Sequence, residues 1–302
     1  MKVLAIETSC DDTSAAVVES RDVFGMCTIS RLKDHANFGG VVPEIASRHH
    51  EESILSVVSE SLKQAKVDLN DIDTVAVTSH PGLIGSILVG TSFAKGVSLA
   101  LGLPLIEVDH ILAHACSPMI EHKDLNPPFL SLVISGGHTS ILNVKNLKEY
   151  EVCCHSVDDA VGEVYDKVAR SMGIPYPGGA ELDRMALTGD PFTYKMPVPK
   201  IDNFSFSGIK TWALNISKNI SESDRNNLAS SLVYGISNYV SDKVIKILNK
   251  YDFDKITVGG GVACSKVLRQ VLHKKLSNKG IQVYFPSPKF CSDNAGMIGL
   301  LA

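Results

Sequence analysis

Two histidines lie four residues apart in the segment Asp109-His110-Ile111-Leu112-Ala113-His114. On a helix this spacing places both imidazole rings on one face, where they can bind the same metal ion. The zinc-protease motif requires a glutamate between its histidines to act as the base, and here isoleucine and leucine fill that gap. The spacing is compatible with a metal site, but among ten histidines a chance pair is the favoured interpretation when the spacing is taken alone. The missing glutamate argues against hydrolysis.

A metal held by two histidines needs at least a third ligand. Asp293, in the segment Cys291-Ser292-Asp293-Asn294, is a polar candidate at the start of a predicted helix. Aspartate is also a preferred N-cap residue. From the sequence alone, the capping role is the favoured interpretation.

Three glycine-rich turns follow predicted strands, at residues 79–82, 135–138 and 259–261. Glycine lets backbone N–H groups approach an anion closely, and a following helix N-terminus adds a favourable dipole. No turn matches the P-loop, and Cys264 replaces the last glycine of a dinucleotide fingerprint. Three such turns at matching places favour nucleotide binding over ordinary tight turns.

Acidic residues are spaced along a predicted helix from Asp159 to Met172. Asp159, Glu163 and Asp166 fall on one face of it, and Asp183 follows Gly179 by four residues. They form either a solvated acidic face or acceptors for the hydroxyl groups of a ribose. The spacing does not decide between these roles.

Strands and helices alternate along the chain. Val3–Ile6, Ala15–Val18 and Thr74–Thr78 are apolar runs typical of buried strands. Pro43 suits the first turn of a helix, and the stretch from Leu83 to Leu101 predicts a largely buried helix.

The same pattern recurs in the second half. Thr13-Ser14 matches Thr139-Ser140, 126 residues later, and the strand from residue 74 matches one from residue 255, 181 residues later. The two offsets predict one β–β–α–β unit used twice, with a helical insertion at about 155–210 in the second copy. We therefore predict lobes at 1–125 and 126–302.

A duplicated α/β lobe is the plan of the actin-like ATPase and sugar-kinase superfamily, whose lobes are ribonuclease H-like. In that two-lobed plan a nucleotide lies in the cleft between the lobes. Two unrelated α/β domains are the alternative.

The 302 residues are 44% hydrophobic and 21% charged, with a net charge of −4. This composition is typical of a soluble globular protein and excludes a polybasic nucleic-acid binder, so RNA binding needs a local patch or a helper protein. Seven scattered cysteines predict a reducing, cytoplasmic compartment, or the mitochondrial matrix in a eukaryote. No uncharged stretch reaches the length of a membrane span, so no membrane association is expected.

Taken together, the motifs resemble the TsaD family of tRNA threonylcarbamoyladenosine transferases. They run in the family's order from residue 3 to residue 298 and comprise IETSCD, GGVVPE, PGL, the histidine pair, SGGHT, YPGG, FSFSG, GGGV and CSDN. The GGVVPE segment resembles the bacterial and mitochondrial branch.

The resemblance implies an actin-like fold and one divalent metal ion, iron or zinc. It implies transfer of a threonylcarbamoyl group from threonylcarbamoyl-AMP to the exocyclic amine of adenosine 37, in tRNAs that read codons beginning with A. The donor is already activated, so no protein nucleophile is needed. Asp11 is the candidate for removing a proton from the amine, with hydrogen bonding inside its own turn as the alternative.

The resemblance also implies a set of binding residues. The metal ligands fall on His110, His114 and Asp293. The substrate-binding residues fall on Val133, Ile134, Ser135, Gly136, Gly137, Asp166, Gly179, Asp183 and Ser265.

This chain departs from the family pattern at several positions. Ser265 replaces an asparagine, Leu112 replaces a glutamate between the histidines, and His80 replaces a glycine. The chain also stops at Ala302, before the family's usual end. We expect the adenylate to lose one contact at Ser265, with binding weakened rather than lost.

The resemblance implies tRNA, a TsaB-like paralogue and a TsaE-like ATPase as partners, and a homodimer is also compatible with the sequence. Three other functions remain open at this point. They are a metalloprotease, an ATPase or kinase of the actin-like plan, and a non-catalytic scaffold that binds nucleotide.

Overall fold

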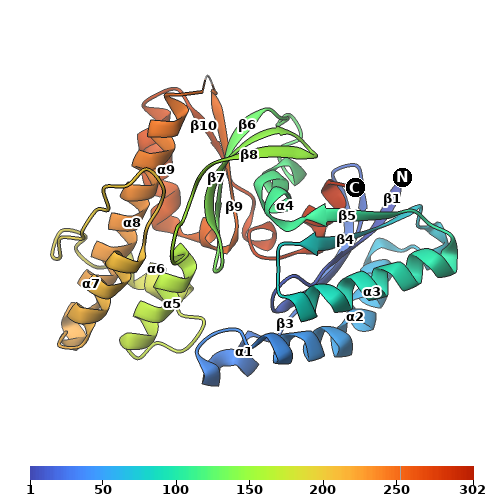
Figure 1. Ribbon diagram of the computed structural model, residues 1–302, viewed down its shortest axis with the longest axis horizontal. Helices are drawn as coiled ribbons and strands as arrows, with labels where there is room; N and C mark the ends of the chain where they lie inside the picture. Colours follow the sequence, from blue (N-terminus) through green and yellow to red (C-terminus); the bar gives the residue numbers. More distant parts are fainter. Residues whose placement is uncertain (252) are drawn as a thin grey trace. The chain divides into compact units, whose positions relative to one another are not determined.

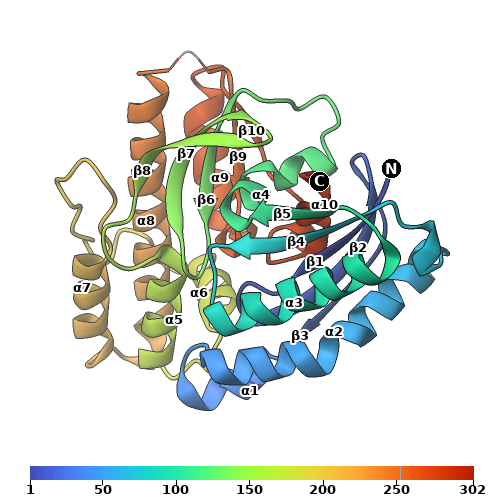
Figure 2. The same ribbon diagram turned by 45° about the vertical axis from the view of Figure 1, so that its right-hand side comes forward.

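A computed structural model describes residues 1–251 and 253–302. The chain forms two compact units (Figures 1 and 2). The first comprises Met1–Asn126 together with Pro286–Ala302, and the second comprises Pro127–Phe285.

The first unit is built on a five-stranded sheet with the order β3-β2-β1-β4-β5. Its strands are β1 (Lys2–Glu7), β2 (Asp12–Glu19), β3 (Asp22–Ser30), β4 (Thr74–His80) and β5 (Leu105–Asp109). Strand β1 pairs antiparallel with β2 and parallel with β4, so that Leu4 lies between Val17 and Val75.

The second unit repeats this arrangement in the order β10-β9-β6-β7-β8. Its strands are β6 (Phe129–Ile134), β7 (Thr139–Asn146), β8 (Glu149–His155), β9 (Lys255–Gly259) and β10 (Gln282–Tyr284). Strand β6 pairs antiparallel with β7 and parallel with β9, as β1 does with its own neighbours. The predicted duplication is confirmed, and each copy is larger than predicted because an outer strand is added at both edges of each sheet.

Helices cover the sheets of both units. The first unit contains α1 (Leu32–His35), α2 (Pro43–Ala65), α3 (Ile84–Leu101), α4 (His110–Cys116) and α10 (Ala295–Leu300). The second contains α5 (Val161–Ser171), α6 (Gly179–Ala186), α7 (Ser207–Ser217), α8 (Arg225–Leu248) and α9 (Lys266–Ser277). The region from 155 to 210, where we predicted an insertion, holds α5, α6 and the first residues of α7.

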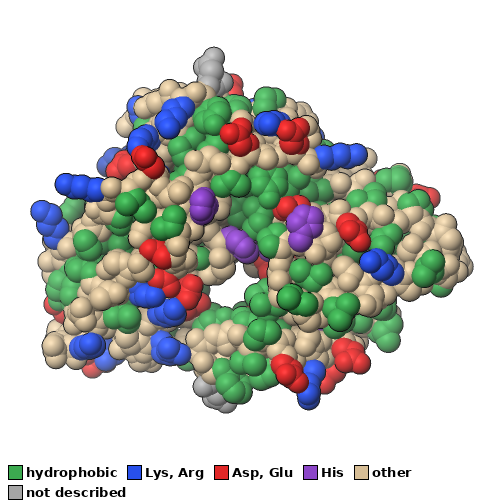
Figure 3. Space-filling view, in the orientation of Figure 1, with side chains coloured by type: hydrophobic (Ala, Val, Ile, Leu, Met, Phe, Trp, Pro, Cys, Tyr) green, Lys and Arg blue, Asp and Glu red, His purple; other side chains and the backbone are tan. Residues whose placement is uncertain are grey.

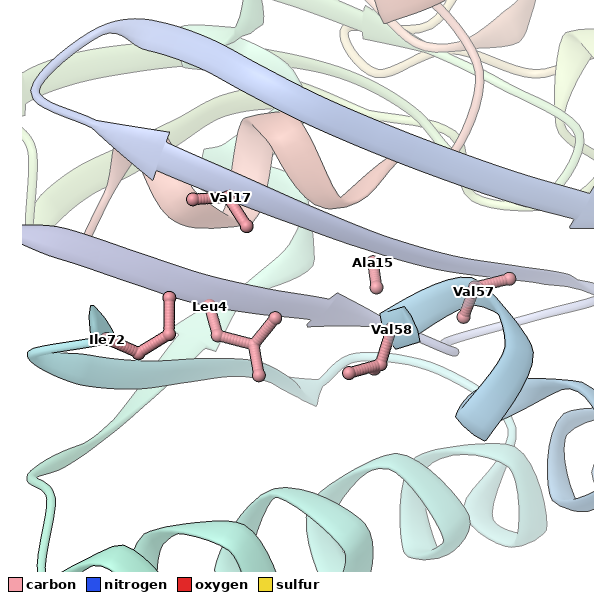
Figure 4. Packing of buried hydrophobic residues seen from close by; sticks show 6 residues of the cluster. All are labelled: Leu4, Ala15, Val17, Val57, Val58 and Ile72. Carbon is pink, nitrogen blue, oxygen red and sulfur yellow. The ribbon is translucent and has the colours of Figure 1, made fainter. Parts of the chain in front are cut away.

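The core of the first unit lies on both faces of its sheet. On one face, Leu4 and Val17 pack with Val57 and Val58 of α2 (Figure 4). On the other face, α10 packs against β1 and β2. Because both faces are covered, β1 is buried from Val3 to Glu7 and appears in the sequence as a continuous apolar run.

Helix α3 is far more exposed than predicted. Only Ser86, Gly90 and Ala94 are buried, whereas Ile84 is 87% exposed and Leu99 is 83% exposed. The small residues bring the helix close to the sheet: a Cβ on Gly90 would lie 2.2 Å from Thr8 Oγ1. The prediction of a largely buried helix is wrong because only one side of α3 packs, through these small residues and the half-buried Phe93 and Val97, while the other side faces outward.

Among the described residues, α3 is also the one helix long and apolar enough to cross a membrane, with a mean hydropathy of 1.5 over 18 residues. Its packing against α2 and β4 makes it a layer of the first unit. Figure 3 shows hydrophobic side chains exposed over this part of the molecule.

The segment from Pro286 to Ala302 also differs from the prediction, which placed all of 126–302 in one lobe. The structure assigns this segment to the first unit. The reason lies in packing, because a Cβ on Gly299 of α10 would be 2.5 Å from Val18 and 3.2 Å from Ala5. Glycine thus lets α10 lie directly on the first sheet.

Candidate active site

The structure brings His110, His114 and Asp293 together within the first unit. Asp293 Oδ1 lies 3.0 Å from His114 Nε2 and 3.6 Å from His110 Nε2. One ligand atom from each residue falls within 4.8 Å of the others. Two ring nitrogens and one carboxylate oxygen therefore converge on a common point.

Helix α4 supplies both histidines. Asp109 caps it by accepting a hydrogen bond from the Leu112 backbone N–H at 2.8 Å, so His110 is the first helical residue and His114 follows one turn later. Every residue of the helix is buried, including Leu112 at the position where the family pattern has glutamate. No acidic side chain lies between the histidines, so this helix supplies no base for a metalloprotease.

Asp293 does not cap α10, contrary to the interpretation that the sequence favoured. The N-cap is Asn294, whose side chain accepts a hydrogen bond from the Met297 backbone N–H at 3.0 Å. The Asp293 carboxylate, one residue earlier, is directed to the histidines instead.

This donor set fits a divalent metal ion. Two imidazoles and one carboxylate form the ligand set of open catalytic zinc sites and of non-haem iron(II) sites. Burial lowers the pKa of His110, but Glu7 and Asp293 more than offset this and raise it to about 9, so the surroundings favour positive charge. Burial and the neighbouring His110 lower the pKa of His114, as suits a neutral ligand.

Glu7 is a functional candidate that the sequence reasoning missed. It is fully buried at the end of β1, and Oε2 lies 3.0 Å from His110 Nδ1 and 2.5 Å from Thr78 Oγ1. Burial raises the pKa of Glu7, but the charge and hydrogen bond of His110 and the hydrogen bond from Ser9 together offset this, so the pKa is lowered and the carboxylate is favoured. A glutamate that ends an apolar strand was the available signal, since buried acids are rare unless paired.

The polar turn after β1 carries Asp11 and is fixed from two helices. His50 of α2 hydrogen-bonds the Cys10 carbonyl through Nε2 at 3.0 Å, and the Ser86 hydroxyl of α3 donates to the same carbonyl at 3.1 Å. Within the described residues, Asp11 Oδ2 is buried without a hydrogen-bond partner. Burial raises the pKa of Asp11, which suits a group that accepts a proton.

In the second unit, the predicted substrate loop forms the hairpin between β6 and β7. Val133 and Ile134 are buried strand residues, so their side chains pack in the core. Ser135 N–H donates to the His138 carbonyl at 2.8 Å, which closes the turn. Gly136 and Gly137 are exposed at its tip, and a Cβ on either would meet nothing within 4 Å. Their backbone therefore has open space beside it for a ligand.

Two neighbouring segments contact this hairpin. The Gly162 N–H of α5 donates to the Ser135 carbonyl at 3.1 Å. Gly260 has φ +94°, a conformation suited to glycine, and a Cβ there would lie 2.4 Å from the Ile134 carbonyl oxygen. The hairpin, the start of α5 and the turn after β9 thus form one edge of the second unit.

Asp166 and Asp183 are engaged by polar groups of the same unit. Asp166 Oδ1 accepts hydrogen bonds from the Gly178 and Gly179 backbone N–H groups at 2.8 and 2.9 Å. The buried Asp183 accepts from the Ser265 hydroxyl at 2.5 Å and from the Lys266 backbone N–H at 2.9 Å. The Asp166 carboxylate is thus not simply exposed to solvent. It orders the glycine turn before α6.

The acidic face predicted alongside Asp166 does not form. Asp159 precedes α5 and pairs with Lys210, with a shortest separation of 2.6 Å, while Glu163 pairs with Lys167 at 2.5 Å. Ser265 caps α9, accepting a hydrogen bond from the Leu268 backbone N–H at 3.1 Å. The serine hydroxyl therefore has two protein partners.

Comparisons of structure support the actin-like fold. The chain superimposes over its full length on component A of the (R)-2-hydroxyglutaryl-CoA dehydratase of Acidaminococcus fermentans (TM-score 0.61, 14% identity, 97% of that chain). A ROK hexokinase from Thermus thermophilus matches with a TM-score of 0.55 and 14% identity, covering 100% of this chain and 97% of that one. At these identities the likeness establishes the fold alone, and it confirms the predicted class.

Comparisons of sequence are more specific. The family model for TsaD, tRNA N6-adenosine threonylcarbamoyltransferase, matches residues 22–300. Proteins of that name from Clostridium perfringens (strain SM101 / Type A) and Clostridium botulinum (strain Hall) are 44% and 45% identical. The alignments cover 99% and 100% of this chain and 91% and 92% of those proteins. The chain therefore belongs to the TsaD family of tRNA N6-adenosine threonylcarbamoyltransferases.

Proposed function

We propose that this enzyme transfers the threonylcarbamoyl group of threonylcarbamoyl-AMP to the exocyclic amine of adenosine 37, in tRNAs that read codons beginning with A. Membership of the family supports the reaction class. The convergence of His110, His114 and Asp293 is the observation that carries the proposal for this chain.

The reaction joins a weak nucleophile to an activated donor. The amine nitrogen of adenosine bonds to the carbamoyl carbon, the bond from that carbon to the phosphate oxygen breaks, and AMP leaves. The nitrogen loses a proton, and we assign its acceptance to Asp11, whose Oδ2 is unpartnered among the described residues. A divalent ion, iron or zinc, held by His110, His114 and Asp293 would supply Lewis acidity toward an oxygen of the acyl group.

The second unit supplies groups suited to the adenylate. The exposed backbone at Gly136 and Gly137 can donate N–H hydrogen bonds to the phosphate. Asp183 has carboxylate acceptor capacity toward a ribose hydroxyl beyond its bonds to Ser265 and Lys266. Asp166 acts by ordering the turn that contains Gly179, the remaining nucleotide-contact candidate.

Transfer of radiolabelled threonine from the adenylate to tRNA tests the proposal. His114→Ala should abolish transfer and lower metal occupancy after purification, because a first-row metal site loses one of three protein ligands. His155→Ala, an exposed histidine of β8, is the matched control and should retain both. Full transfer by a metal-free His114→Ala protein would refute the metal's role.

We further propose that the exposed face of α3 binds a TsaB-like paralogue. Ile84, Leu88 and Leu99 lie on one side of this helix, and Leu88 is 63% exposed. Lys95, the one charged residue of the helix, lies 3.7 Å from Glu107, which leaves the face close to neutral. Apolar area of this kind is typical of a protein interface.

Size-exclusion chromatography with the purified paralogue tests this interface. Leu88→Glu should prevent the complex, whereas Val198→Glu, at an exposed apolar position of the second unit, should leave it intact. A complex that survives the first substitution would refute the assignment. Dimerisation of this chain through α3 in place of paralogue binding would assign the face to a homodimer instead.

The remaining partners follow from the family and the composition. The family name identifies tRNA as the substrate, and the net charge of −4 supports docking of tRNA through helper proteins. We propose a TsaE-like ATPase as a further partner and the cytoplasm as the compartment. Transfer assayed with each protein added singly would show which partners are required.

A further inference from the structure

The two candidate metal-binding histidines have different surroundings at the ring nitrogen that faces away from Asp293. His110 Nδ1 lies 3.0 Å from Glu7 Oε2 and 3.1 Å from Ser9 Oγ. His114 Nδ1 is buried and has no hydrogen-bond partner among the described residues. The Nδ1 atom of His110 is therefore held by neighbouring side chains, whereas that of His114 is not.

We propose that Glu7 is a positioning residue that fixes the tautomer and ring orientation of His110 for metal binding. The proposal rests on the metal centre assigned above and adds a residue outside its ligand set. A carboxylate can only accept a hydrogen bond, so the Nδ1 proton of His110 is directed to Glu7. The lone pair of Nε2 is then presented on the side of Asp293, where the three ligand atoms converge.

Glu7 is itself held rigidly, as this role requires. Its side chain is fully buried and accepts hydrogen bonds from the Ser9 backbone N–H through Oε1 and from Thr78 Oγ1 through Oε2, both at 2.5 Å. These contacts come from the turn after β1 and from the neighbouring strand β4. The carboxylate therefore has little freedom to follow the imidazole, and the imidazole must conform to it.

Glu7 also completes the charge of the site. Asp293 and Glu7 together contribute two negative charges, which balance a divalent cation bound by two neutral imidazoles. Removal of the Glu7 charge leaves an uncompensated positive charge in a buried environment. Substitution of a carboxylate that is hydrogen-bonded to a metal-binding histidine typically lowers metal affinity by about 10–100-fold.

Titration of the full-length chain with Zn²⁺ against a chromophoric chelator tests the proposal, with Co²⁺ absorption as a second readout. Glu7→Gln keeps the size of the side chain and removes its charge, and we expect its Kd for Zn²⁺ to rise at least tenfold. The visible Co²⁺ spectrum should change because the His110 ligand is no longer held in one orientation. Glu7→Ala should weaken binding further.

Ser98→Ala is the control, because it deletes a part-buried hydrogen bond of the same unit, from the Ser98 hydroxyl to the Leu103 carbonyl, without touching Glu7 or either histidine. It should lower stability toward urea but change the Kd for Zn²⁺ by less than threefold. Equal affinity and spectra for Glu7→Gln and the unmodified chain would overturn the positioning role. Failure of the unmodified chain to bind either metal would instead overturn the metal centre. A metal-binding unmodified chain that gives no transfer even with its proposed partners added would overturn the reaction assignment alone.

Discussion

Gly162 is the position where one added methyl group would test how the hairpin at residues 135–138 is fixed. It is the second residue of α5, and an ideal Cβ there would lie 2.8 Å from Gly136 Cα and from the Ser135 carbonyl oxygen. These are backbone atoms, which cannot rotate away as a side chain would. Gly162→Ala must therefore displace either α5 or the hairpin.

Gly208 supplies a control at the same helical position. It is the second residue of α7, and a Cβ there would meet nothing within 4 Å. Both substitutions reduce the freedom of the unfolded chain equally, which stabilises by about 0.4–1 kcal/mol where the native site has room. The difference between the variants therefore isolates the steric cost, which is about 1–3 kcal/mol for overpacking.

Urea unfolding and transfer kinetics would be measured on both variants. Gly208→Ala should be slightly more stable than the unmodified chain, with unchanged transfer. Gly162→Ala should be less stable than Gly208→Ala by the steric cost, and its transfer at low adenylate concentration should fall about tenfold or more because the hairpin is displaced. If both variants match in stability and transfer, α5 does not fix the hairpin and our account of this edge is wrong.

Two further predictions concern buried polar groups. Burial raises the pKa of Asp12 from 3.8 to about 7, so its contribution to stability is present below about pH 4 and is lost as the pH rises through about 7. Between pH 4 and pH 8, the free energy of unfolding of Asp12→Asn in urea should therefore rise by about 4 kcal/mol relative to that of the unmodified chain. Parallel pH profiles of the two proteins would contradict the raised pKa. Ser265→Ala should lower the free energy of unfolding by about 2–3 kcal/mol, because the α9 cap and the hydrogen bond to Asp183 are both lost. Ser265→Asn, which retains a capping acceptor, should lose less in the same assay, and equal losses would argue against the capping role.

The sequence was sufficient for the repeated unit, because strands buried on both faces are continuous apolar runs and the turn residues recur at a fixed offset. The outer strands were missed because their buried and exposed residues alternate or because they are short: β10 spans only Gln282–Tyr284. The exposure of α3 could not be predicted, since composition does not reveal which side of an apolar helix packs. Here the packing side combines small residues such as Gly90 with the half-buried Phe93 and Val97.

The candidate site was predicted unevenly for a related physical reason. The histidine pair is local in sequence and visible from its spacing, whereas its carboxylate partners are brought in by tertiary structure. Glu7 precedes His110 by 103 residues, and Asp293 follows His114 by 179. Either of two adjacent polar residues could have been the N-cap of α10. Only the structure shows that Asn294 is the N-cap and that the Asp293 carboxylate faces the histidines.

The insertion of the second unit between Asn126 and Pro286 sets an order of events during translation. The ribosome synthesises both histidines early and then the whole second unit before it reaches Asp293. A nascent chain that has not reached this residue holds only two of the three candidate ligands, so the proposed metal centre is complete only when nearly all of the described sequence has been made.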